Sequence, residues 1–174
     1  MVGTSATLRD VQTADKQTLR TVMREVRRAI AADAADRRDR SGRIWDGIVR
    51  AASLRPGRAV MLFESLPTEP DTAAWFAWCR EHGVAAFAPS VDGPHLRVQP
   101  GDVDPGDLDV VVVPGLAFTS DGRRLGQGGG HYDRFLPRLR PDCLTVGAAY
   151  AEQLVHDLPT EPHDIPLDLV VTDA

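Results

Sequence analysis

Four consecutive valines, Val110 to Val113, constrain the fold of this chain more than any other feature of its sequence. A strand that is apolar at every position, and not only at every second one, is typical of a strand buried on both faces. Such a strand needs a layer of structure on each side, which helices packed on an α/β sheet provide. The run therefore predicts a buried strand over 108–113 inside a layered α/β domain.

The rest of the chain alternates between helix and strand patterns. Asp15 is placed to cap a helix that starts at Lys16, whose apolar residues recur at helical spacing: Leu19, Val22, Met23, Val26 and Ile30. Further helices are predicted over 36–52, 71–79 and 132–139, with a helical turn at 152–155. Further strands are predicted over 59–63, 84–88, 95–98, 144–149 and 169–172. This alternation predicts a mostly parallel sheet in one domain over 15–174, preceded by a flexible lead-in over 1–14.

Composition and charge exclude several classes of protein. The chain has 174 residues and a formal net charge of −5, which suits one globular domain and argues against a nucleic-acid binder. It contains no apolar run of the roughly 18 residues that a membrane span needs, and no secretory signal is expected near Met1. Cys79 and Cys143 stand in apolar contexts and are interpreted as buried thiols. We therefore expect a cytoplasmic monomer with no nucleic-acid or membrane partner.

The segment that follows the valines contains the residues most suited to chemistry. Four glycines occupy five positions, 126 and 128–130, after Arg123 and Arg124 and before Tyr132 and Asp133. Backbone N–H groups at the end of a strand, together with the start of a helix, form an anion site suited to phosphate. The arginines can donate charge-assisted hydrogen bonds, and Asp133 can hold a metal that bridges phosphate oxygens. A tight turn without a ligand is the alternative interpretation.

Two common phosphate-binding motifs do not fit this loop. No Gly-Lys-Ser or Gly-Lys-Thr follows, which excludes a P-loop, and His131 stands where the third glycine of the dinucleotide fingerprint would fall. The first helix is basic, and its charged residues are expected largely off the apolar stripe; they are Lys16, Arg20, Arg24, Arg27 and Arg28. This basic region either faces an anionic ligand or is a solvated helix face.

Over residues 114–136 the chain resembles the signature of the 5-formyltetrahydrofolate cyclo-ligase family. That signature runs Pro-Gly-x-Ala/Gly-Phe, Gly-x-Arg-Leu-Gly, a glycine triplet or Gly-Lys-Gly, and Tyr-Tyr-Asp, and this sequence aligns with it without a gap. Thr119 stands where the family usually has Asp, and His131 stands where it has the first Tyr. The resemblance extends to a Lys-x-x-x-Arg pattern at 16–20, a loop at 65–72 and a tail at 162–168. It implies a three-layer α/β/α domain of the sugar-isomerase and CoA-transferase-like type.

The resemblance implies ATP- and Mg²⁺-dependent closure of 5-formyltetrahydrofolate to 5,10-methenyltetrahydrofolate, with phosphorylation of the formyl oxygen and release of ADP and phosphate. It implies catalytic roles for Arg124 and Tyr132 and Mg²⁺ ligands at Asp133 and Asp164. The substrate contacts that it implies are Leu66, Asp71, Gly128, Gly129, Gly130, His131 and Tyr132. The ATP contacts that it implies are Lys16, Gln17, Thr18, Leu19, Arg20, Arg124, Leu125, Gly126, Gln127, Gly128, Gly129, Gly130, His131 and Tyr132.

Two other functions stay open at the level of sequence. One is a non-catalytic nucleotide-binding homologue that keeps the fold. The other is an ATP-dependent enzyme that acts on a different N-formyl substrate, because Asp71 and His131 depart from the family pattern where substrate contacts are expected. Asp71 is one methylene shorter than the glutamate that is usual at its position in the resemblance.

Overall fold

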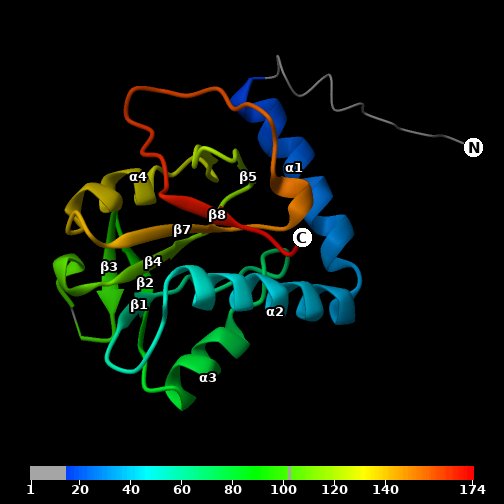
Figure 1. Cartoon of the computed structure of the whole chain (residues 1–174). Coiled ribbons are helices and arrows are strands. Elements are labelled where there is room, and N and C mark those ends of the chain that lie inside the picture. The colour runs from blue at the N-terminus through cyan, green and yellow to red at the C-terminus, as the bar shows by residue number, and fades with distance from the viewer. Residues whose placement is uncertain (1–14, 102) are drawn as a thin grey trace, which may run out of the picture.

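The computed structural model of the chain describes residues 15–101 and 103–174 (Figure 1). The lead-in predicted for 1–14 lies outside the described residues. The described chain forms a sheet with helices on both sides, which confirms the predicted layered α/β architecture with a mostly parallel sheet. Within these two ranges, no helix is long and apolar enough to cross a membrane.

Six strands form the main sheet in the order β3-β2-β1-β4-β7-β8. Parallel pairing joins β2 (Ala85–Asp92), β1 (Ala59–Met61), β4 (Val110–Val113), β7 (Leu144–Ala148) and β8 (Leu169–Val171). At the edge, β3 (His95–Gln99) pairs with β2 in an antiparallel hairpin. The chain passes from β1 to β2 on one side and later places β4 on the other side of β1. The carboxyl ends of β1 and β4 therefore meet at a switch point, where open α/β sheets hold ligands.

The valines of β4 are fully buried, as predicted, and they face two separate cores. The first and third valines belong to an apolar cluster with Trp75 of α3 (Ala73–Glu81) and Ile48 of α2 (Ala34–Ala51). The second and fourth belong to a cluster on the opposite face with Phe135 of α4 (His131–Phe135). The period-two alternation of a strand thus sends one continuous apolar run into both layers.

The helices begin close to the predicted positions, and the differences have local causes. Helix α1 (Lys16–Ala31) starts as predicted because Asp15 Oδ1 accepts hydrogen bonds from the backbone N–H groups of residues 17 and 18. Helix α2 starts at Ala34 rather than at position 36, since Asp33 caps it in the same way. The helix predicted over 132–139 is divided into α4 and the 3₁₀ turn η2 (Leu136–Arg138), which contains Pro137.

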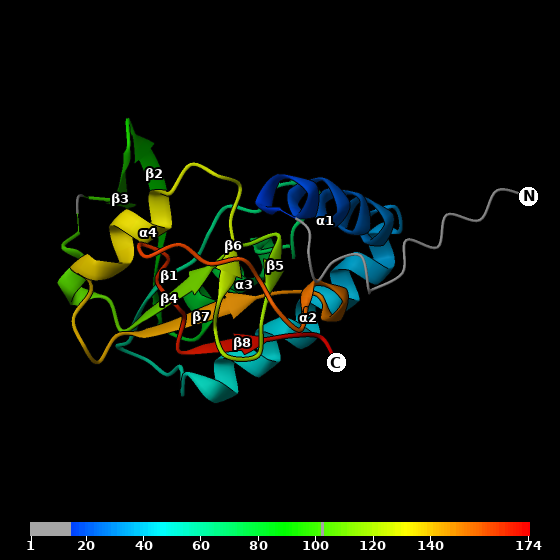
Figure 2. The same ribbon diagram turned by 90° about the horizontal axis from the view of Figure 1, so that it is seen from above.

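Short elements that the sequence did not predict complete the fold. Strands β5 (Ala117–Phe118) and β6 (Arg124–Leu125) form an antiparallel hairpin apart from the main sheet, and the 3₁₀ turn η1 (Pro105–Asp107) precedes β4. The predicted turn near residue 152 is the 3₁₀ turn η3 (Ala151–Gln153). Two-residue strands leave no periodicity in a sequence, so pattern alone could not reveal the hairpin. Figure 2 shows it between α4 and α1, with the glycine segment leading from β6 to α4.

Candidate functional site

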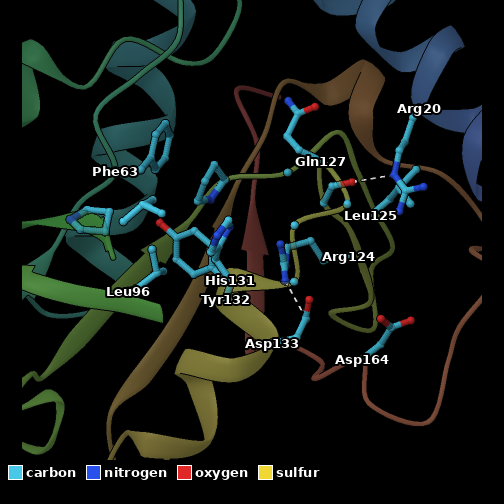
Figure 3. Close-up of a pocket in the computed structure, with 18 of the residues that line it drawn as sticks. Arg20, Phe63, Leu96, Arg124, Leu125, Gln127, His131, Tyr132, Asp133 and Asp164 are labelled. Atoms are coloured by element: carbon cyan, nitrogen blue, oxygen red, sulfur yellow. Dashed lines mark hydrogen bonds and ion pairs between the residues drawn. The ribbon is translucent and has the colours of Figure 1, made fainter. Parts of the chain in front are cut away.

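A pocket of about 380 Å³ opens beside the carboxyl ends of β1 and β4, at the switch point of the sheet. Phe63 and Glu64 follow β1 and line one part of it, while Pro114 and Gly115 follow β4 and line another. The segment between β6 and α4, the start of α1 and the 161–164 segment supply further walls. Parts of the chain that are far apart in sequence thus meet at one cavity (Figure 3).

The glycine segment, residues 126–130, lines the pocket largely with backbone. Gly128 and Gly130 have φ angles of +107° and +64°, which residues with a side chain rarely adopt. A Cβ atom at Gly130 would also lie 2.8 Å from Nη1 of Arg134. Glycine is therefore required by the path of this backbone, and its missing side chains leave room for a ligand to approach closely.

Helix α1 brings two cations to the glycine segment. Arg20 Nε donates a hydrogen bond to the carbonyl oxygen of Gly126 at 3.1 Å, and both Arg20 and Lys16 line the pocket. Arg24 Nη2 donates to Oε1 of Gln127 at 3.0 Å. The second and third turns of α1 are thus fixed against the loop that contains the predicted phosphate site.

Gln17, Thr18 and Leu19 were also predicted to contact ATP. They are not among the described residues that line the pocket. The backbone N–H groups of Gln17 and Thr18 are taken by the Asp15 cap, and both side chains are exposed. Leu19 is buried in an apolar cluster with Leu125, below the pocket wall. The Lys-x-x-x-Arg pattern therefore presents its two charged ends to the cavity, because residues four apart share one helix face.

Each of the two predicted metal ligands forms an ion pair with a predicted phosphate-binding cation. Asp133 Oδ1 accepts from Arg124 Nη2 at 2.8 Å, and Asp164 Oδ2 accepts from Lys16 Nζ at 2.8 Å. Lys16 Nζ also lies 3.4 Å from Oε2 of Glu161. Partial burial opposes ionisation of Asp164, but the Lys16 ammonium and the Glu161 backbone N–H hold the pKa of that carboxyl below its ordinary value.

The pocket contains the oxygen donors that a hard divalent cation requires. Asp133 and Asp164 both line it, beside the glycine segment (Figure 3). Glu161 and His163 place further potential ligand atoms around Asp164, all within 4.8 Å of one another. Carboxylate oxygens suit Mg²⁺, so the donor set fits that ion.

The other end of the pocket is apolar and aromatic. Phe63 and Leu96 line it and face the ring of Tyr132 (Figure 3). The Tyr132 hydroxyl is buried and has no hydrogen-bond partner among the described residues. Burial raises the pKa of Tyr132 far above its ordinary value, so the phenol stays neutral and can act as a hydrogen-bond donor. His131 and Leu66 line the same pocket, as the resemblance implied.

Of the two acidic residues at positions 69 and 71, Glu69 lines the pocket and Asp71 does not. Asp71 is absent from the described lining; its Oδ2 accepts from Arg37 at 3.3 Å, and its Oδ1 accepts from the N–H of Ala73 at the start of α3. Glu69 lines the pocket and is 6% exposed, and its Oε1 lies 3.2 Å from Nη2 of Arg27. The loop turns Asp71 toward α2, where it contacts Arg37, so the carboxylate of this loop that lines the pocket is two residues earlier than the predicted one.

Arg27 corrects another expectation from the sequence. It was expected largely off the apolar stripe of α1, yet it is 1% exposed and lies on the buried face with Leu19, Met23 and Ile30. A helical wheel places position 27 next to that stripe, but spacing alone did not reveal a buried partner. The signal in the sequence was a charged residue inside an apolar repeat.

Several lining residues carried no usable signal in the sequence. Phe63, Pro89, Val91 and Leu96 come from the ends of β1 and from the β2–β3 hairpin, where no motif was recognised. They reach the pocket because parallel pairing of β1 with β2 brings the hairpin beside the switch point. Tertiary placement of this kind depends on strand order, which local patterns do not encode.

Comparison with known proteins agrees with this geometry. The model of the 5-formyltetrahydrofolate cyclo-ligase family matches residues 91–173. The mitochondrial 5-formyltetrahydrofolate cyclo-ligase of Arabidopsis thaliana is 40% identical over 77 residues, which cover 38% of this chain and only 28% of that protein. The 5-formyltetrahydrofolate cyclo-ligase of Mycolicibacterium smegmatis is 26% identical over 90% of this chain and 93% of its own length.

A solved structure extends the similarity to the whole fold. The 5,10-methenyltetrahydrofolate synthetase of Mycoplasma pneumoniae superimposes with a TM-score of 0.82 and 26% sequence identity, covering 92% of this chain and all of that one. Sequence similarity and fold point to the same group of proteins. The chain is thus similar to 5-formyltetrahydrofolate cyclo-ligases in its C-terminal half by sequence and over most of its length by fold.

Proposed function

We propose that this protein catalyses the ATP- and Mg²⁺-dependent cyclisation of 5-formyltetrahydrofolate to 5,10-methenyltetrahydrofolate. The observation that carries the proposal is the division of one pocket into two ends. One end combines the glycine segment with Lys16, Arg20 and Arg124, and the other combines apolar walls with Glu69. A triphosphate and a reduced pterin ring require these two surfaces side by side. The activity in the names of the relatives supports the same reaction.

The chemistry requires activation of a poor leaving group. The formyl oxygen of the substrate is amide-like and does not leave unaided. Transfer of the γ-phosphoryl group of ATP to that oxygen releases ADP and makes the oxygen part of a good leaving group. N10 then attacks the formyl carbon, its proton is lost, the C–O bond breaks, and inorganic phosphate departs with the former formyl oxygen. The protein must therefore hold the γ-phosphate in line with the formyl oxygen and balance moving charge.

The cationic end is suited to the triphosphate. Backbone N–H groups of residues 126–130 can donate to phosphate oxygens, and Arg124, Arg20 and Lys16 can balance their charge. Asp133 and Asp164 would hold Mg²⁺, which when bound neutralises part of the phosphate charge. The ion pairs Arg124–Asp133 and Lys16–Asp164 support this arrangement, because each contains one partner for phosphate and one for metal. Mg-ATP can satisfy both members of each pair at once.

The apolar end is suited to the folate ring. Phe63, Leu96 and Tyr132 offer ring and aliphatic surface, and Leu66 is half exposed at the mouth. The Glu69 carboxylate can accept hydrogen bonds from the ring N–H groups of a pterin. The neutral Tyr132 hydroxyl can donate to the oxygen that is phosphorylated. Arg124 lies with its guanidinium carbon 5.6 Å from the centre of the Tyr132 ring, so the proposed catalytic pair stands between the two ends.

The test is a product assay with the purified protein, 5-formyltetrahydrofolate, ATP and Mg²⁺. We expect the absorbance band of the methenyl product to appear only when all three components are present. If ATP binds but no methenyl product forms, the folate reaction is refuted while the phosphate site stands. ADP release with other N-formyl compounds would then identify the alternative enzyme, and failure of every such compound would favour a non-catalytic nucleotide-binding homologue.

A further inference from the structure

Arg27 connects three segments that surround the pocket. Its own side chain is not among the described residues that line the pocket. Its Nε donates to the carbonyl oxygen of Thr68 at 3.1 Å, and its Nη2 donates to Oγ1 of the same residue at 2.8 Å. Its Nη1 donates to the carbonyl oxygen of Gly115 at 3.2 Å, and Nη2 lies 3.2 Å from Oε1 of Glu69. One guanidinium thus joins α1 to the loop after β1 and to the loop after β4.

The orientation of Glu69 depends on this contact. Oε1 of Glu69 is held by Arg27, and Oε2 accepts from the backbone N–H of Leu66 at 2.9 Å. Glu69 as a whole is 6% exposed, and it is one of the residues that line the pocket. Because both oxygens have a fixed donor, the carboxylate presents one defined direction to a ligand.

Stability alone does not account for a guanidinium at this position. Burial lowers the pKa of Arg27, because taking the cation out of water is unfavourable. The neighbouring Glu69 carboxylate acts in the opposite direction and raises that pKa. An apolar side chain would continue the buried stripe of Leu19, Met23 and Ile30 without that penalty. The arginine instead supplies a planar set of donors that matches a carboxylate and two carbonyl groups.

We propose that Arg27 is a positioning residue for the substrate end of the pocket, acting through the carboxylate of Glu69. It also fixes the loops on both sides of the cavity to the helix that carries Lys16 and Arg20. This inference rests on the proposed function, because the reaction that reports on it is the cyclisation described above.

The test compares Arg27→Lys with the wild type in steady-state kinetics. Lysine keeps the charge but loses the fork of donors, so Glu69 loses its fixed direction. We expect the KM for 5-formyltetrahydrofolate to rise about tenfold, while the KM for ATP changes less than about twofold. Arg40→Lys is the matched control, since Arg40 is a poorly exposed arginine on α2 whose carboxylate partners, Glu152 and Asp173, are not among the described lining residues. It should lower the melting temperature and leave both KM values unchanged.

A double-variant cycle with Glu69→Gln separates positioning from general structural support. If Arg27 acts through Glu69, then Arg27→Lys should change the folate KM by less than about twofold in the Glu69→Gln background. If the fold-change in the folate KM of the double variant equals the product of the fold-changes of the two single variants, the proposal is overturned. If Arg27→Lys does not fold, Thr68→Val removes one acceptor of the guanidinium and preserves its charge. We then expect the folate KM to rise about threefold, and an unchanged folate KM would overturn the proposal.

The outcomes also separate this inference from the proposed function. A wild-type protein that forms no methenyl product refutes the reaction and the role of Arg27 together. An active wild type whose Arg27→Lys variant behaves like Arg40→Lys refutes the role of Arg27 alone. An active wild type with a selective, Glu69-dependent rise in the folate KM supports both.

Discussion

Arg123 and Arg124 are neighbours in the sequence, but their side chains have different surroundings. Arg124 lies in the pocket, where its side chain is 6% exposed and pairs with Asp133. Arg123 is 30% exposed and pairs with Asp121 and Asp157 away from the pocket lining. Arg124 is the first residue of β6, whereas Arg123 precedes that strand in the turn whose backbone is closed by the hydrogen bond from Thr119 N–H to the Arg123 carbonyl oxygen.

The two arginines form a matched pair of substitutions. Arg124→Met should lower kcat/KM for ATP by about a hundredfold or more, because a charge-assisted contact to the transferred phosphate is lost. Arg123→Met should leave kcat and both KM values within about twofold of the wild type, since the ion pairs and the hydrogen bond to the Leu158 carbonyl oxygen that it breaks lie away from the pocket lining. Initial rates of methenyl formation measure both variants. Equal losses in the two would contradict a role for Arg124 in phosphate binding.

The Tyr132 hydroxyl gives a prediction in which stability and activity move apart. It is buried without a partner among the described residues, so Tyr132→Phe removes an unsatisfied polar group. We expect the free energy of unfolding to stay the same or to rise by up to about 1 kcal/mol. We expect kcat to fall about tenfold, because a hydrogen bond to the reacting oxygen is lost. Urea denaturation and rate measurements test this, and an unchanged kcat would remove the hydroxyl from the reaction.

At the scale of elements, the glycine segment is placed by three neighbours and not by its own sequence. The β5–β6 hairpin carries it away from the main sheet, α1 holds Gly126 through Arg20, and α4 begins directly after its last glycine, which is the N-cap. The glycine pattern correctly predicted a loop that leads into a short helix, but the strand before this loop is β6 and not the predicted valine strand. It could not predict the hairpin, whose strands of two residues each depend on packing against the rest of the domain.

The same substitution at two glycines tests what the loop requires. Gly130→Ala should lower the free energy of unfolding by about 1 kcal/mol or more, because φ is +64° and the new Cβ meets Arg134. Gly42→Ala should raise it by about 0.5–1 kcal/mol, since Gly42 lies inside α2 and no described atom would be within 4 Å of its Cβ. Denaturant titration measures both. A loss of similar size at Gly42 would show that the effect is not specific to the left-handed backbone.

Helix α1 illustrates which parts of a site a pattern can indicate. Helical spacing correctly placed Lys16 and Arg20 on one face, and both line the pocket. The same spacing did not identify Arg27, because a buried charge depends on partners supplied by other segments, here Thr68 and Glu69. A periodic pattern reports on one helix only. The burial of an ion pair depends on two segments, which here are α1 and the loop after β1.

At the scale of the whole molecule, the switch point between β1 and β4 determines which loops can meet. Sequence patterns identified the strands and the rule that ligands lie at their carboxyl ends. They did not give the strand order, so the contribution of the β2–β3 hairpin through Leu96 was not expected. The chemistry-bearing segments were thus predictable from motifs, while the apolar wall was a consequence of topology. The functional roles assigned to all of these residues stay predictions.

The last strand is attached to the rest of the domain by charge as well as by pairing. Asp173 follows β8, accepts from Arg40 of α2, and accepts from the N–H of Ala151 at 2.8 Å. Burial opposes its ionisation, but these donors hold the pKa of Asp173 below its ordinary value of 3.8. A carboxylate with a lowered pKa in the folded state stabilises that state above its unfolded pKa, and loses this effect as the pH falls through the folded pKa.

Asp173→Asn should therefore destabilise the domain in a pH-dependent way. We expect the free energy of unfolding to fall by about 1–3 kcal/mol at neutral pH. The difference from the wild type should shrink as the pH falls below 3.8 and through the lower pKa of the folded state, where the Asp173 carboxylate becomes protonated. Urea denaturation at several pH values measures this, with the exposed Glu25→Gln as a control. A difference that does not depend on pH would show that ionisation of Asp173 contributes little.

The ion pair between Lys16 and Asp164 joins residues that are 148 positions apart. During synthesis, a ribosome presents Lys16 early, but it must translate most of this sequence before Asp164 can reach it. Until then, the first helix lacks its partner at the mouth of the cavity. A nascent or prematurely terminated chain that ends before this aspartate therefore cannot assemble the complete cation–carboxylate arrangement. Complete translation through residue 164 is thus a condition for this arrangement to form.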